Sequence, residues 1–488
     1  MSMKSFKSVY RCCLQTVTPV HIGCDEVYEP TAFTVDEAQR HLTVVSPLRL
    51  IQSFSADDRT RFSAICRQGS VASILEIYKF LRHRQFEGRT VAVCSDFIGH
   101  YRSTLEIPAR DERRAQNELN KFEIPRTAFR NGDGRAYIPG SSVKGALRTA
   151  YLNGMEQSKK LAAKGRPFKD QMQLQQALLD YRNIPGDPFR MVKVSDFQPV
   201  GPILTKIVYA VNQKKVPGNH QARGLPLLME VILPGATFIG QISVEKPHPS
   251  ADIQSPIVQD LFLQAARHFF AAEWERESSE LAKIQVPTES FTLPKAACLL
   301  RCGRHSGAES VTVQGHRNIR IMGKRGERPK FLDHATTLWL ASESRHPEIT
   351  RGMMPFGWTV LAPLTTEIEE KCRQVEKAYF EKEGAYVSQS AAAPAAQSPT
   401  TAKTVEPQDS PPPIEKQLWS RASLTWDAGS ETLTASAEGR KASTRDQNLI
   451  PTSLSPRLIK KGKKKAVFAT VIVEPVGNAF QIVEIKAQ

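Results

Sequence analysis

The sequence predicts an α+β protein with antiparallel sheets, followed by a small all-β module. Strand-like and helix-like segments alternate irregularly through the first 385 residues, and several strand pairs are separated only by short turns. A parallel doubly wound sheet would show a regular alternation instead. A segment rich in Pro, Ala, Ser and Thr then divides the chain, and only period-2 patterns follow it. We therefore expect two mixed units at residues 1–190 and 191–385, a flexible linker at 386–416, and an all-β module at 417–488.

Hydrophobic periodicity locates the elements of the mixed region. Strands are expected at residues 9–22, 42–45, 135–138, 191–194 and 203–211. Residues 57–83 are expected to be mainly helical, and residues 142–161 to form a helix. Residues 227–233 and 237–244 are expected to form a hairpin about Pro234 and Gly235. A helix at 257–281, short strands at 297–301 and 359–361, and a helix at 365–384 complete the region.

The linker and the last module are predicted from composition and alternation. Residues 386–416 contain six Pro and almost no large apolar residue, so they cannot bury enough surface to offset their chain entropy. Residues 423–437 and 466–485 each alternate apolar and polar residues around a turn, which is typical of a β-hairpin.

The charge balance favours a polyanionic partner. The 66 Lys and Arg residues outnumber the 50 Asp and Glu residues, which gives a formal net charge of +16. Nucleic acid is the first candidate and an anionic membrane surface the second. No apolar run approaches the ~18 residues of a membrane span, and no secretion signal is visible. The eight Cys form no C-x-x-C pair. We expect a cytoplasmic protein without membrane contact.

The stretch YIPGSSVKGALR at residues 137–148 predicts an anion site. A strand ends at Pro139 and a helix is expected to begin at Ser142, which could cap it. A helix start carries unpaired N–H groups and a partial positive charge. Lys144 and Arg148 share one face of this helix, so the site would suit a phosphodiester. An ordinary capped helix with solvated basic residues explains the pattern equally well.

Three further features could carry chemistry. Residues 301–330 contain eight Lys or Arg and two Glu, interrupted by five Gly, and are either a phosphate-binding loop or a solvated charged loop. His21 stands at the end of the first strand, where a lone His is more often structural than catalytic. Five Lys at residues 460–465 could be a nucleic-acid arm or a solubilising loop.

Metal binding is not expected. Cys298, Cys302 and His305 have the spacing C-x3-C-x2-H, which could supply three zinc ligands, but a structural site needs four. Cys298 fits better in the apolar strand at residues 297–301. We expect no metal and no cofactor.

Three blocks, in this order, resemble the CRISPR type III RAMP superfamily. They are residues 18–23 followed by 28–31, the IPGSSVKGALR block at 138–148, and LLRCGRHSGAESV at 299–311 followed by MPFGW at 354–358. The resemblance spans roughly residues 9–362. The later blocks are most similar to the fifth-subunit family of the type III-A Csm effector complex.

The resemblance implies a fold and a function. Such proteins are built from ferredoxin-like units that resemble RNA-recognition modules. The fifth subunit caps the filament of backbone RAMP subunits at the 3′ end of the CRISPR guide RNA and supports crRNA maturation and antiviral RNA interference. It neither cleaves the target RNA nor makes cyclic oligoadenylate. Its partners would be the guide RNA and the backbone subunits, and target RNA and host nucleases are further candidates.

The resulting hypothesis is a non-catalytic RNA-binding subunit of a ribonucleoprotein. Its candidate RNA-binding residues are His21, Gly23, Gly140, Ser141, Ser142, Lys144, Arg148, Arg304, His305, Arg317, Arg320, Lys324 and Arg325. The alternative is a metal-independent RAMP endoribonuclease that processes CRISPR RNA, with His21 or His305 as general base. Asp196 is the best isolated acid, although a strand-end turn explains it as well. A third hypothesis is an architectural protein without RNA contact.

Overall fold

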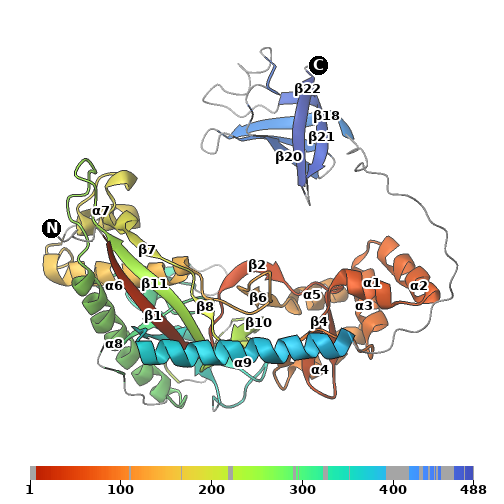
Figure 1. Cartoon of the computed structure of the whole chain (residues 1–488), viewed down its shortest axis with the longest axis horizontal. Helices are drawn as coiled ribbons and strands as arrows, with labels where there is room; N and C mark the ends of the chain where they lie inside the picture. The colour runs from red at the N-terminus through yellow and green to blue at the C-terminus, as the bar shows by residue number, and fades with distance from the viewer. Residues whose placement is uncertain are drawn as a thin grey trace. The chain divides into compact units, whose positions relative to one another are not determined.

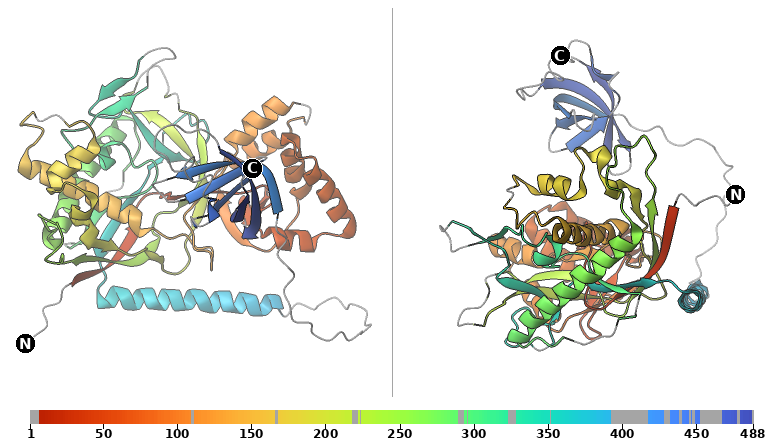
Figure 2. Two further views of the ribbon diagram at one scale, coloured as in Figure 1. Left: turned by 90° about the horizontal axis from the view of Figure 1, so that it is seen from above. Right: turned by 90° about the vertical axis from the view of Figure 1, so that its left-hand side faces the viewer.

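The computed structural model describes residues 7–391 and 417–486, apart from short gaps. The gaps are residues 109–110, 166–167, 218–221, 223, 289–292, 295, 323–327, 351, 428–431, 438–439, 445, 447–448, 452–466 and 477–478. The chain forms two compact units, Met1–Ala393 and Pro394–Gln488. Figures 1 and 2 show helices and sheets in unit 1 and a small barrel in unit 2.

The first sheet of unit 1 has the strand order β12-β17-β1-β11-β7, with β8 also paired to β11. All its pairs are antiparallel. Because β1 is central, Leu14 pairs with Leu361 on one side and Phe238 on the other. The strands are β1 (Lys7–Thr16), β7 (Val192–Val194), β8 (Gln198–Pro199), β11 (Thr237–Glu245), β12 (Cys298–Arg301) and β17 (Trp358–Pro363).

Two long helices cover this sheet. α6 (Gly140–Lys159) and α8 (Gln259–Lys283) pack on each other and on the sheet, and α7 (Gln171–Leu179) packs on α6. Leu147 of α6, Phe270 of α8 and Trp358 of β17 are buried in the same core. The helices predicted at 142–161 and 257–281 are therefore confirmed, each shifted by about two residues.

The second sheet has the order β16-β15-β9-β5-β4-β3, with β10 also paired to β9. Its pairs are antiparallel except that of β5 with β9. The strands are β3 (Phe33–Asp36), β4 (His41–Val44), β5 (Arg89–Val93), β9 (Thr205–Lys214), β10 (Leu227–Ile232), β15 (Thr337–Ser342) and β16 (Met354–Pro355). Two short ribbons join β2 (Gly23–Val27) to β6 (Pro125–Thr127) and β13 (Ile319–Ile321) to β14 (Lys330–Leu332).

Five shorter helices precede α6: α1 (Pro47–Ser53), α2 (Ala56–Arg67), α3 (Val71–Leu81), α4 (Phe97–Leu105) and α5 (Glu112–Lys121). The segment at 57–83, predicted as mainly helical, is confirmed as helical and forms two separate helices, α2 and α3. Gly69 adopts a φ of 58°, and the Ser70 hydroxyl accepts a hydrogen bond from the Ser73 N–H at 3.2 Å. This cap starts a second helix where periodicity alone would continue the first.

Three predictions need correction. The strands at 227–233 and 237–244 exist, but they form no hairpin, because β10 pairs with β9 in one sheet and β11 with β1 in the other. Residues 135–138 contain no extended strand, only single bridges at Ala136 and Ile138. Both large sheets draw strands from each side of residue 190, so a division there separates no pair of sheets.

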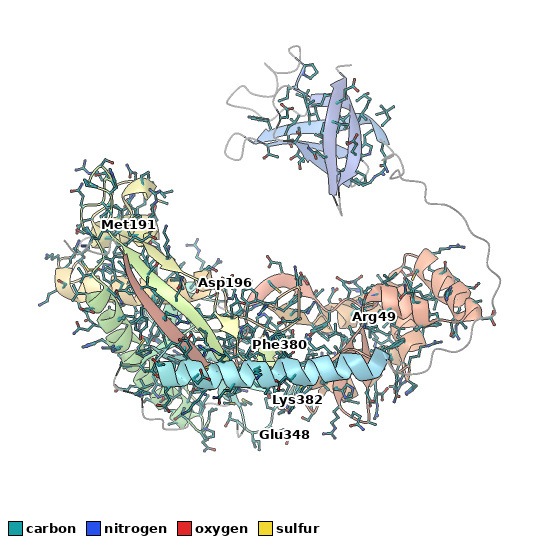
Figure 3. The ribbon with its side chains drawn as sticks, viewed as in Figure 1. Arg49, Met191, Asp196, Glu348, Phe380 and Lys382 are labelled. Carbon is teal, nitrogen blue, oxygen red and sulfur yellow. The ribbon has the colours of Figure 1, made fainter. Side chains whose placement is uncertain are left out.

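Helix α9 (Thr366–Ala391) lies along unit 1 as a long rod, and Figure 3 labels Phe380 and Lys382 on it. The Arg135 guanidinium pairs with the Glu376 carboxylate of α9 at 2.8 Å, and Arg11 pairs with Glu369 at the same distance. The helix is longer than predicted, so residues 386–391 of the expected linker are helical. Residues 392–416 lie outside the described residues.

Unit 2 is a closed β-barrel with the strand order β18-β19-β20-β22-β21. The strands are β18 (Gln417–Asp427), β19 (Thr432–Ala437), β20 (Arg440–Thr444), β21 (Val467–Val476) and β22 (Ala479–Lys486). The predicted hairpins are confirmed, because β18–β19 and β21–β22 are antiparallel neighbours. No helix among the described residues has the length and apolar character to cross a membrane.

Candidate nucleic-acid interface

Segments far apart in the sequence meet where β1 ends. The Arg304 N–H donates to the His21 carbonyl oxygen at 2.8 Å, and the Gly357 N–H donates to the Pro19 carbonyl oxygen at 2.9 Å. Gly303 has a φ of 90°, and a Cβ there would lie 2.4 Å from the His21 carbonyl oxygen. Only glycine permits this approach. The turn at residues 18–23, the loop after β12 and the PFGW loop therefore form one structure, which we call the loop junction.

His21 lies inside the loop junction, not on its surface. The ring is fully buried, and Nδ1 is 2.7 Å from the Glu230 carbonyl oxygen of β10. A carbonyl only accepts, so Nδ1 carries the proton and Nε2 holds a lone pair. No polar partner contacts Nε2 in the described structure. Burial lowers the pKa of His21, so the ring is neutral. The adjacent Gly23 is exposed.

His305 and Arg304 differ although they are neighbours. The His305 ring centroid lies 4.7 Å from that of Trp339 and 5.3 Å from that of Phe356, and burial, together with the Arg304 charge, lowers its pKa to about 4. Its Nε2 is buried without a hydrogen-bond partner in the described structure. Arg304 is exposed, and it makes no ion pair with any described residue. The loop junction therefore exposes one cation, Arg304, and contains two neutral imidazoles, those of His21 and His305.

The start of α6 is already occupied by a carboxylate. The helix begins at Gly140, and the Gly140 N–H donates to Oδ1 of Asp196 at 2.8 Å. Figure 3 labels Asp196 just beyond β7. The expected cap at Ser142 is wrong, because Ser142 lies in the first turn and no side chain of the N-cap residue bonds the helix. A Cβ at Gly140 would lie 2.4 Å from the Val194 carbonyl oxygen, so this glycine allows helix and strand to approach.

The two cations of this helix also differ. Lys144 is half-buried and has no ion pair among the described residues, and burial and the nearby Lys193 charge lower its pKa. Arg148 is paired with the Asp187 carboxylate at 2.9 Å and hydrogen-bonded to Gln175 at 2.8 Å. Lys144 is thus available to an anion, whereas Arg148 is held by the fold. Ser141, at the exposed side of this turn, is open to solvent.

Glutamates of α8 neutralise part of the basic stretch at residues 301–330. Arg301 pairs with Glu277 at 2.7 Å with both side chains 1% exposed, and Arg317 pairs with Glu273 at 2.6 Å. Arg317 is therefore a fold-stabilising cation and not an open contact. The sequence analysis missed this because α8 reads as a helix with one apolar face, whereas Glu273 and Glu277 are buried as well.

The rest of the basic stretch forms a small exposed ribbon. Arg320 of β13 pairs in register with Phe331 of β14, and both are exposed, as are Arg328 and Lys330. Arg320 makes no ion pair with a described residue. Lys324 and Arg325 lie outside the described residues. Phe331 was not predicted as a site residue, but a large aromatic within a basic stretch is a signal for base stacking that could have identified it.

The cysteines near the loop junction are buried, and they bear on the question of metal binding. Burial raises the pKa of Cys298 and of Cys302 to about 12, so both are neutral thiols. The part of the chain that the structure describes contains no group of three or more His, Cys, Asp or Glu side chains arranged to hold a metal ion.

Comparison with known proteins identifies the family. Residues 13–279, more than half of the chain, match the RAMP superfamily. The chain belongs to the RAMP superfamily. The predicted resemblance is confirmed, and the loop junction and the α6 start are thus parts of a RAMP protein.

The relatives are Csm5 proteins of CRISPR systems. The chain is 22% identical to Csm5 of Enterococcus italicus over 277 residues, which cover 54% of this chain and 68% of the relative. It is 29% identical to Csm5 of Streptococcus thermophilus over 160 residues, or 31% of this chain and 40% of the relative.

Two solved structures are also similar to this RAMP protein. A chain of a Csm–crRNA–target RNA ternary complex of a type III-A system has a TM-score of 0.47 and 19% identity, with 72% of this chain and all of that chain covered. Csm5 of T. onnurineus has a TM-score of 0.41 and 17% identity, with coverage of 71% and 99%.

Proposed function

We propose that this RAMP protein is a non-catalytic, guide-RNA-binding subunit of a type III-A CRISPR effector complex. Its curated relatives are named as Csm5 proteins of CRISPR systems. The net charge of +16 is suited to an RNA partner. The mixed fold with mainly antiparallel sheets is compatible with two ferredoxin-like units, one around each large sheet of unit 1.

The observation that carries the proposal is the exposed Arg304 on the loop junction. Backbone hydrogen bonds and Gly303 fix the position of this loop. A cation on a rigid loop can bind a phosphate without reading the base. Arg320 beside Phe331 adds a second cation and an aromatic surface on which a base can stack. Such contacts tolerate any spacer sequence, as a guide RNA requires.

We place the subunit at the end of the backbone filament that holds the 3′ part of the guide RNA. There it caps the filament, supports crRNA maturation and contributes to antiviral RNA interference. Its partners are the guide RNA and the backbone RAMP subunits. Target RNA and host nucleases are further partners that this position would bring close.

The groups expected of an endoribonuclease argue for the non-catalytic assignment. A general base must reach the proton that it abstracts. His21 is fully buried, and Nε2 of His305 is buried between aromatic rings. Asp196 accepts the hydrogen bond that starts α6.

Assembly with guide RNA tests the proposal. The full chain is co-expressed with the backbone subunit and guide RNA, and the double variant Arg304→Ala/Arg320→Ala is compared with the native chain. We expect lower guide RNA retention and irregular guide 3′ ends. Lys371→Ala/Lys377→Ala is the control, since it removes the same charge from exposed, Glu-paired residues of α9. Equal retention by both double variants would overturn the assignment of the interface.

A second assay separates the non-catalytic subunit from the endoribonuclease. The full chain is incubated with repeat-containing RNA, with and without EDTA. We expect intact RNA under both conditions. Cleavage that persists in EDTA and disappears in His305→Ala or His21→Ala would establish the endoribonuclease instead.

A further inference from the structure

The strand order of unit 2 defines a particular kind of barrel. Numbered along the chain, its five strands are ordered first, second, third, fifth, fourth, and the fourth closes back on the first through β18 and β21. The third and fifth strands, β20 and β22, are parallel, whereas the other neighbours are antiparallel. This is the arrangement of the OB barrel, which presents oligonucleotide-binding surfaces on unrelated proteins. A β-bulge between Trp419 and Ala422 bends the first strand around the barrel.

The interior of the barrel cannot hold a ligand. Large side chains such as Trp419 and Leu424 pack against the small side chains of Ala435, Ala442 and Ala469, and all are buried. A five-stranded barrel filled in this way is a hydrophobic core and not a cavity. Any ligand must therefore bind on the outer surface.

One outer surface is defined by strand register. Phe468 of β21 lies opposite Ser423 of β18, which lies opposite Ser436 of β19. One step along the strands, Thr425 lies opposite Thr434, which lies opposite Ser443 of β20. We call these residues the barrel face: Ser423, Thr425, Thr434, Ser436, Ser443 and Phe468. Its row from Phe468 to Ser436 crosses two strand spacings, or about 10 Å.

The chemistry of the barrel face suits single-stranded nucleic acid. The Phe468 side chain is 51% exposed, so its ring can receive a base. The other five residues carry hydroxyl groups, which can donate or accept hydrogen bonds with phosphates and sugars. A stable protein interface needs an apolar centre, and Phe468 is the one large apolar side chain of this face.

The sequence of residues 417–488 carries an excess of positive charge. Residues 417–488 contain eleven Lys and Arg against six Asp and Glu. Five of these Lys lie at residues 460–465, in the connection between β20 and β21. The described residues of the barrel carry four Lys or Arg and four Asp or Glu, so the excess of cations belongs to residues outside the described structure. The barrel face itself offers a ring for stacking and neutral hydroxyl groups, which suit an unpaired strand of any sequence.

We propose that the barrel of residues 417–486 binds single-stranded nucleic acid across the barrel face, with a base stacked on Phe468. This site is distinct from the interface of unit 1 and does not depend on it. The contacts require no particular base, so the preference would be for an unpaired strand.

Photo-crosslinking in the full chain measures this site separately. A 12-nucleotide oligouridine that carries 4-thiouridine is irradiated with the protein over a range of concentrations, and adducts are assigned by peptide mass spectrometry. The concentration dependence of adducts in residues 417–486 gives the affinity of the barrel itself. We expect Phe468→Ala to weaken it by roughly 5- to 100-fold. Adducts in residues 1–393 should be unchanged. A matching DNA oligonucleotide shows whether the 2′-hydroxyl contributes.

Leu418→Ala is the matched control. Leu418 is 64% exposed and lies on β18, where it pairs with Ile472 of β21, beyond the part of β18 that contacts β19. Phe468→Trp should retain binding, and thermal unfolding checks that each variant folds. The proposal is overturned if neither RNA nor DNA forms barrel adducts, which would leave a protein as the occupant. Equal losses in Leu418→Ala and Phe468→Ala would overturn it too.

Discussion

At the scale of single residues, neighbouring acids decide what each arginine does. Arg317 and Arg148 are paired with carboxylates of distant segments, whereas Arg304 and Arg320 are exposed and make no ion pair with a described residue. All four look alike in the sequence. The acid that pairs with Arg317 comes from α8, 44 residues earlier in the chain. Sequence could therefore locate the basic stretch but not separate its open cations from its paired ones.

Arg304→Ala should therefore change RNA binding, and Arg317→Ala should change the stability of the fold. Arg304→Ala should weaken RNA binding and reduce the slope of log K against log salt by ~0.7 per lost phosphate contact, with unfolding unchanged. Arg317→Ala should lower the unfolding free energy by roughly 3 kcal/mol, because it removes one partner of the buried Glu273 carboxylate. Salt-dependent fluorescence anisotropy and thermal unfolding measure the two effects. Identical salt slopes for both variants would contradict this division.

Glu309 should make the stability of unit 1 depend on pH. Burial opposes its ionisation, but the hydrogen bond and charge of Lys215 outweigh burial and lower the pKa of Glu309 to about 2. In the unfolded chain the pKa is near the ordinary value of about 4.3. A lowered folded pKa contributes stability above that ordinary value and loses it as the pH falls towards 2.

The expected loss from Glu309 is roughly 3 kcal/mol between pH 5 and 2. Thermal unfolding across this range measures it, and Glu309→Gln supplies the comparison. The native chain and this variant should converge in stability at the acidic end. Parallel curves would mean that another carboxylate causes the acid sensitivity.

At the scale of elements, the start of α6 depends on a close approach that only glycine permits. The IPGSSVKGALR block predicted this helix, although two residues late. Its first N–H is satisfied by Asp196, which comes from a segment 56 residues later. A sequence gives strong signals for a helix cap supplied by a neighbouring residue. It gives none for a carboxylate that comes from a distant segment. Likewise, period-2 patterns identified β10 and β11 but not their partners, because alternation contains no information about which strand lies alongside.

Two glycines of this helix should respond oppositely to alanine. At Gly140 a Cβ would lie 2.4 and 2.6 Å from the carbonyl oxygens of Val194 and Ser195, so Gly140→Ala must displace α6 from β7. At Gly145 a Cβ meets nothing within 4 Å. Gly145→Ala should therefore stabilise the protein by up to about 1 kcal/mol through helix propensity. Gly140→Ala should destabilise it by roughly 2 kcal/mol or more. Thermal unfolding of both variants is the measurement, and a stabilised Gly140→Ala would refute the close approach.

At the scale of the whole molecule, the chain consists of two units with separate cores. The Pro-rich composition of residues 386–416 predicted a linker, and the two units divide within it, between Ala393 and Pro394. The barrel after it was predicted as paired hairpins. Its closure was not predicted, since the parallel contact of β20 with β22 joins strands that no turn connects. The α+β character of unit 1 was predictable, but its two interleaved sheets were not.

Limited proteolysis should cut within residues 392–416, because their composition, rich in Pro, Ala, Ser and Thr, predicts a linker of the kind that proteases enter. The expected products are a body that ends after α9 and a folded barrel fragment. The body should retain RNA binding and assembly with the backbone filament, since it contains the loop junction and the α6 start. Gel filtration with guide RNA tests this. If a chain that ends at Ala393 fails to retain guide RNA, the main RNA-binding site lies in the barrel.

The central position of β1 affects synthesis of the protein on the ribosome. Leu14 pairs with Leu361, which is made roughly 350 residues later. Until then β1, the middle strand of the first sheet, lacks one of its two neighbours. At ~5–20 residues per second, translation reaches Leu361 roughly 20–70 s after Leu14, and β1 has β11 as its one neighbour only for about the last 6–25 s of that interval. The nascent chain thus exposes an apolar strand edge through most of its elongation. Ribosome-bound chains with residue 340 outside the tunnel should lose β1 to a protease. Chains with residue 380 outside the tunnel should protect β1.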